Sequence, residues 1–197
     1  MILQNRLKGN LTIVIGLFLV LSVSVKSFSQ QYNLDNQSSE LKIFGTSSLH
    51  DWHEDAEEQN GVIYLDVNGK LKINKLEIEV IAESLKSGKR GMDKNTYKAL
   101  KTDVYKSIVF QLTETKQISK LSDQNYKVEA YGDLTVAGVT RRIELNFDLI
   151  MNKDDLELIG EKAFNMTYFD IEPPKALLGT IKTGDEVVLK FKTIFTK

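Results

Sequence analysis

The chain has no cysteine and little of several other residues that carry chemistry. The lack of cysteine excludes disulfides, thiolate metal sites and cysteine nucleophiles, so packing alone must hold the fold. There are two histidines and two prolines, and the prolines stand side by side at positions 173 and 174, where they mark a break. Basic residues are no more frequent than acidic ones, 26 against 27. A chain with this balance is a poor candidate for a nucleic-acid partner.

The first 29 residues have the features of a signal peptide. Arg6 and Lys8 precede an apolar run at residues 11–25, and no acidic residue occurs before Asp35. The run is short for a membrane span but suits the core of a signal peptide. An uncleaved anchor helix is the alternative. We expect export to the periplasm or the exterior, and a processed protein that is not an integral membrane protein.

Residues 30–197 are long enough for one domain with a substantial core. The clearest pattern lies between residues 126 and 149. Apolar side chains occupy even positions up to Val136 and odd positions from Ile143, with polar or charged residues between them. Such alternation is typical of half-buried strands, and Gly138 lies between the two halves. The sequence therefore predicts a β-hairpin that turns at Gly138.

Similar alternation recurs along the chain, and about eight strands and one short helix are expected. In the first half Ile63, Leu65 and Val67 are predicted to face inward. The helix is expected at about residues 94–101 with Asp93 as its cap. Roughly eight antiparallel strands can close as a barrel or pack as a sandwich, and the pattern alone leaves both open.

Few side chains are arranged for catalysis. The only histidines are His50 and His53, and on a strand these two positions would face opposite sides, so a metal site would require a tight turn. The other interpretation is that Trp52 packs over a barrel end while its polar neighbours hydrogen-bond to loop backbone. No nucleophile elbow or phosphate-binding glycine run occurs. We therefore expect no enzyme, no catalytic residue and no resident cofactor, and the predicted site contains no metal.

Four segments resemble one protein family. The sequence GDLTVAGVTR at residues 132–141 is similar to the hairpin of the YceI-like family. Three other segments also resemble the family and occur in its order along the chain: GTSSLHDW at 45–52, YKSIVF at 105–110 and FNMTYF at 164–169. The resemblance implies a mainly β fold, a single antiparallel eight-stranded lipocalin-like barrel with one short helix. It also implies an exported protein that binds a polyisoprenoid or a related amphiphile.

The resemblance gives the inward-facing positions a function, since they would line the ligand tunnel. They include aromatic and aliphatic side chains and no charge. The predicted ligand-binding residues are Ile43, Ile78, Val80, Ile108, Phe110, Leu112, Val128, Leu134, Val136, Ile143, Leu145, Phe147, Phe164, Met166, Leu189 and Phe191.

The expected function is therefore that of a carrier or sequestering protein, with a bound isoprenoid or other lipid and a hydrophobic or amphipathic small molecule as its partner. A homodimer is left open. The alternative is a barrel with a filled core that acts as an envelope-stress or protein-interaction module, because large side chains such as Phe147 and Phe164 could fill the interior.

Overall fold

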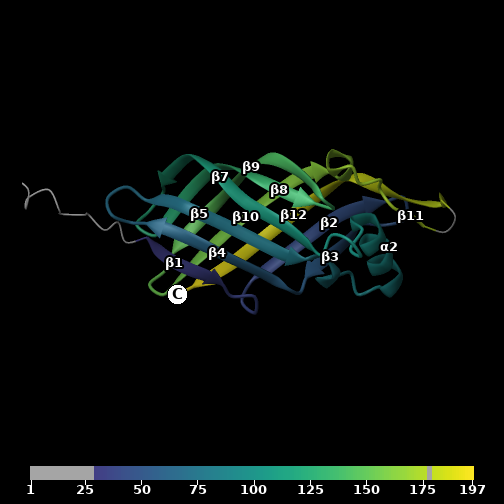
Figure 1. Cartoon of the computed structure of the whole chain (residues 1–197), viewed down its shortest axis with the longest axis horizontal. Coiled ribbons are helices and arrows are strands. Elements are labelled where there is room, and N and C mark those ends of the chain that lie inside the picture. The colour runs from purple at the N-terminus through teal and green to yellow at the C-terminus, as the bar shows by residue number, and fades with distance from the viewer. Residues whose placement is uncertain (1–28, 177–178) are drawn as a thin grey trace, which may run out of the picture.

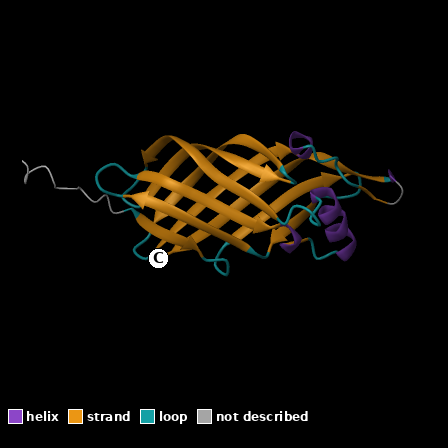
Figure 2. Cartoon of the chain, viewed as in Figure 1, coloured by secondary structure: helices purple, strands orange, loops and turns teal. Residues whose placement is uncertain are grey.

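The computed structural model describes residues 29–176 and 179–197 and shows an elongated β-barrel with a helix at one end (Figures 1 and 2). All but the last residue of the predicted signal peptide lies outside the described residues. The strands are β1 (Gln30–Leu34), β2 (Glu40–Ser47), β3 (Trp52–Ala56), β4 (Gln59–Asp66), β5 (Lys72–Ile81), β6 (Leu85–Lys86), β7 (Ser107–Lys120), β8 (Asn125–Val136), β9 (Val139–Met151), β10 (Asp155–Asn165), β11 (Lys175–Ala176) and β12 (Ile181–Thr196). The helix α2 spans Arg90–Leu100, and short 3-10 helices span Ala82–Ser84 and Met166–Phe169.

The strands form one closed antiparallel sheet. The order runs β1-β4-β5-β7-β8-β9-β10-β12, and β1 also pairs with β12, which closes the ring. At the other end β12 pairs with β2, β2 with β3 and β3 with β6. The barrel therefore contains three interrupted strands, β1/β2, β3/β4 and β5/β6. In each of them one part pairs at one end of the barrel and the other part at the opposite end. The prediction of an antiparallel eight-stranded barrel with one short helix is confirmed.

The predicted hairpin is β8 and β9, and its alternation has the expected cause. Val128 and Ala130 are fully buried on the even face of β8, while Ile143 is buried on the odd face of β9. The two turn residues between the strands, Ala137 and Gly138, have φ angles of 49° and 80°. Positive φ at both positions is the conformation whose twist matches that of the flanking strands. A Cβ atom on Gly138 would also overlap the ring of Tyr105, so this position requires glycine twice over.

Two local predictions are wrong. The helix begins at Arg90, four residues before the predicted start, and Asp93 lies inside its first turn. Its carboxylate accepts hydrogen bonds from the backbone N–H and the hydroxyl of Ser87, so it fixes the preceding loop instead of capping the helix. Val67 is 36% exposed because β4 ends at Asp66 and the chain already turns there toward Gly69.

The barrel interior is filled at one end and hollow at the other. At the end opposite α2, where the C-terminus lies in Figure 1, inward side chains from five strands are completely buried. These are Ile63, Leu65, Val128, Leu149, Leu156 and Phe195. Close packing of this kind leaves no room for a ligand. A large pocket lies in the half of the barrel nearer α2.

Candidate functional site

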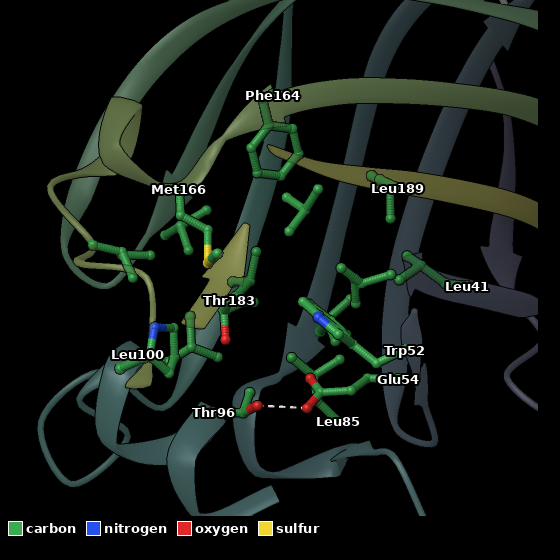
Figure 3. Close-up of a pocket in the computed structure, with 18 of the residues that line it drawn as sticks. Leu41, Trp52, Glu54, Leu85, Thr96, Leu100, Phe164, Met166, Thr183 and Leu189 are labelled. Carbon is green, nitrogen blue, oxygen red and sulfur yellow. Dashed lines mark hydrogen bonds between the residues drawn. The ribbon is translucent and has the colours of Figure 1, made fainter. Parts of the chain in front are cut away.

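A pocket of about 490 Å³ occupies the barrel half beside α2 (Figure 3). Most strands contribute inward side chains to its wall, and α2 contributes one face of the helix. Leu49, at 66% exposure, and the exposed side chains of His50, Lys89 and Lys175 lie among the lining residues and mark the mouth. The pocket therefore opens at the α2 end and is closed by the packed side chains at the other.

The structure places all but two of the predicted ligand-binding residues on this wall. The residues that line the pocket are Ile43, Ile78, Val80, Ile108, Phe110, Leu134, Val136, Ile143, Leu145, Phe147, Phe164, Met166, Leu189 and Phe191. Val128 does not line it, because it is completely buried in the filled end of the barrel. Leu112 is half-buried against the core outside the pocket, next to a register shift in β7.

The sequence did not indicate that α2 forms part of the wall. Met92, Thr96, Ala99 and Leu100 all line the pocket, whereas the basic residues of the helix, Arg90, Lys94 and Lys98, are exposed. The spacing of these residues, four and three or four apart, places them on one helical face. That spacing is visible in the sequence, but what the face covers depends on where the helix docks.

The expectation of an interior without charge is wrong, because Glu54 faces inward. It is 2% exposed and lines the pocket, and its Oε1 accepts a hydrogen bond from the Thr96 hydroxyl of α2 (Figure 3). The alternation in β3 could have indicated this direction, because Trp52, Glu54 and Ala56 point to one face of the strand and His53 and Asp55 to the other. Glu54 also pairs across β2 and β3 with Ile43, one of the residues predicted to face inward.

Burial raises the pKa of Glu54 from its ordinary value of 4.5 to about 7. The Thr96 hydrogen bond acts in the opposite direction, and the negative charge of Asp93 adds a smaller increase. Loss of hydration disfavours the charged form of a carboxyl group, whereas a donated hydrogen bond favours it. Here desolvation dominates, and the carboxyl group changes charge near neutral pH.

Replacement of Glu54 by glutamine is expected to remove a pH dependence of stability. Below about pH 4.5 the carboxyl group is protonated in both the folded and the unfolded state, so it does not make the free energy of unfolding depend on pH. Between 4.5 and about 7 the folded state binds more protons, so stability falls as pH rises, by about 3 kcal/mol in all. Urea unfolding of wild type and Glu54→Gln across this range measures it. The exposed Glu58→Gln variant is the control, and parallel curves for wild type and Glu54→Gln would contradict the assignment.

The two histidines do not form a metal site with their neighbours. His50 Nδ1 lies 2.8 Å from the carbonyl oxygen of Asp51, and His53 stacks beside Phe44 on the outer face, 3.8 Å from Asp55. In residues 29–176 and 179–197 no three His, Cys, Asp or Glu side chains gather closely enough to hold a metal ion.

Trp52 closes over Gly45 at the rim of the barrel. A Cβ atom on Gly45 would overlap the indole, and the indole N–H donates to the carbonyl oxygen of Thr46 at 2.9 Å. The geometry of this segment therefore agrees with the interpretation in which Trp52 packs over the barrel end.

In the described part of the chain no helix has the length and apolar character needed to cross a membrane.

A closed eight-stranded barrel with a pocket at one end defines a lipocalin-like class of protein, since a barrel of this size can hold one small ligand. The chain belongs to the YceI-like family: the family model described as YceI-like domain matches residues 32–195. The resemblance drawn from the four sequence segments is confirmed.

Solved structures share this fold at low sequence identity. BcnA of Burkholderia cenocepacia has a TM-score of 0.67 and 13% identity, over 82% of this chain and 98% of that one. A polyisoprenoid binding domain from Saccharophagus degradans has a TM-score of 0.66 and 12% identity, over 84% and 97%. The YCEI protein of Campylobacter jejuni has a TM-score of 0.56 and 17% identity, over 73% and 84%. Comparison with curated proteins gives no match.

Proposed function

We propose that the protein is an exported lipid-binding protein that holds a long isoprenoid or a similar amphiphile in the barrel, as a carrier or a sequestering protein. The observation that supports this proposal best is the pocket of about 490 Å³ with its almost wholly apolar deep wall. Its volume lies in the range of small-molecule sites. The polyisoprenoid binding domain with the same fold supports the choice of ligand.

Apolar contact alone can supply the binding energy. Burial of a hydrocarbon chain gains about 0.8 kcal/mol for each methylene-sized unit. Several isoprene units would therefore offset the entropy lost when the ligand is ordered. Such binding needs no nucleophile, acid or base, and this proposal treats the protein as a binding protein and not as an enzyme.

Leu134→Trp is expected to block the pocket and reduce lipid uptake at least tenfold. Leu134 is 5% exposed and lines the pocket, so a larger ring would occupy the ligand's space. The matched control is Thr135→Trp, because the neighbouring side chain lies on the opposite face of β8. The measurement is native mass spectrometry of both variants and wild type, purified from the original host and then incubated with polyprenols, quinones and fatty amides. A wild-type protein that stays free of ligand throughout would refute the proposed function.

A further inference from the structure

Nearly all polar groups on the pocket wall lie at its open mouth. Ser47, Asn95 and Thr183 are partly exposed, and His50 and Lys89 are exposed, so water can satisfy their polar atoms. Two polar lining residues are different, because Glu54 is 2% exposed and Thr193 is 0% exposed. Of these two, only Glu54 carries an ionisable group.

Placing Glu54 on an apolar wall costs free energy, because its carboxyl group loses hydration there. An aliphatic side chain at this position could pack equally well against the neighbouring residues. Ile43 lies across the strand pair, and Trp52 and Leu85 lie beside Glu54 (Figure 3). Buried carboxyl groups normally receive several hydrogen bonds or a counter-charge. Within the described residues, the Glu54 carboxyl group accepts one side-chain hydrogen bond, which the Thr96 hydroxyl donates.

Among the residues that the structure describes, no cation neutralises Glu54. The ammonium group of Lys86, on the adjacent strand β6, contacts Tyr97 and the backbone carbonyl of Glu83 instead. On α2 the charged group that acts on Glu54 is Asp93, which is negative. Lys89 and His50 lie at the exposed rim. The carboxyl group therefore has free acceptor capacity, and it is the ionisable group on the buried part of the pocket wall.

We propose that Glu54, oriented by Thr96, is the head-group site of this pocket, and that it takes an amphiphile whose polar end donates hydrogen bonds: an amine, an amide or an alcohol, and not a carboxylate or a phosphate. This inference rests on the proposed lipid-binding function. The polar end then lies near α2, and the hydrocarbon chain runs toward Phe147 and Leu158 at the pocket's inner limit.

The chemistry of the group sets this selectivity. An ionised carboxylate offers acceptors alone, and an ammonium head would pair with it as well as donate to it. A second anion in the same low-dielectric space would be repelled. In its neutral form the Glu54 carboxyl can both donate and accept, so discrimination against anions should weaken at lower pH.

Four ligands with the same oleyl chain test the proposal: oleylamine, oleamide, oleyl alcohol and oleic acid. Binding to the full barrel is measured by calorimetry at about pH 8 and about pH 6, on either side of the pKa of about 7. At the higher pH we expect the three donor heads to bind at least about tenfold more tightly than oleic acid. At the lower pH the difference should shrink.

Two variants separate the head-group site from the rest of the pocket. Glu54→Gln should keep the amide and the alcohol but lose the additional preference for the amine. Glu54→Leu should bind all four chains with similar affinity, and circular dichroism verifies that both variants are folded. Equal binding of oleic acid and oleylamine by wild type, or selectivity unchanged in Glu54→Leu, would overturn the inference while lipid binding stands. Failure of all four ligands to bind would instead refute the proposed function.

Discussion

Leu145→Asp is expected to lower the free energy of unfolding by about 4 kcal/mol or more and to abolish lipid binding with it. Leu145 is 6% exposed, lines the pocket and pairs across the sheet with Ala130, which is completely buried. The substitution removes about 2 kcal/mol of apolar burial. It also leaves an unpaired carboxylate in the interior, which costs several kcal/mol unless the group takes up a proton.

The adjacent residue provides the matched control, because Asn146 points to the outside of the same strand and is exposed. Asn146→Asp introduces the same side chain one position along, and we expect a change within about 0.5 kcal/mol. Urea titrations of both variants at neutral pH give the comparison. If the two variants were equally stable, β9 would not have one face inside the barrel and one in solvent.

The contrast between these two positions is also what made the fold predictable. Alternation along β8 and β9 depends only on neighbouring residues and on which face is buried, so the hairpin and its inward residues follow from the sequence alone. The turn residue Gly138 has a positive φ, which glycine adopts readily. Local chemistry determines these features, and the prediction succeeded there.

Whether an inward position touches a ligand is not a local property. Val128 and Val136 share a residue type, a strand and a face, but Val128 is buried in the filled end and Val136 lines the pocket. The difference arises from what the opposite wall contributes at each level of the barrel. Alternation assigns both residues to the interior and carries no information about that level.

The position of α2 was hidden for a similar reason. Its apolar face is visible in the sequence, but the helix reaches the pocket only because the chain between β6 and β7 folds over the mouth. Glu54 gains its burial from that placement, since Thr96 on α2 lies against it. The inward direction of Glu54 was readable from the alternation in β3. Its raised pKa depends on the helix and on the closed barrel around it.

Phe195→Ala is expected to lower the free energy of unfolding by about 4 kcal/mol without weakening lipid binding by the protein that remains folded. Phe195 is 0% exposed in the filled end, where its strand neighbours are Leu34 and Leu156. Loss of the ring removes apolar burial and leaves a new cavity among close-packed side chains, and both effects destabilise the fold.

Phe191→Ala is the comparison that distinguishes the two halves of the barrel. Phe191 lies on the same strand and the same face, and it lines the existing pocket. Its ring already lacks packing partners on the pocket side, so its removal enlarges a space instead of creating one, and a loss of about 2 kcal/mol is expected. Lipid affinity should change in this variant and not in Phe195→Ala. Denaturant unfolding with and without lipid measures both effects, because a ligand that binds only the folded state adds stability according to its affinity. Equal losses of stability together with equal losses of affinity would show that the interior is uniform along its length. The filled end would then not differ from the pocket half in its contribution to stability and to lipid binding.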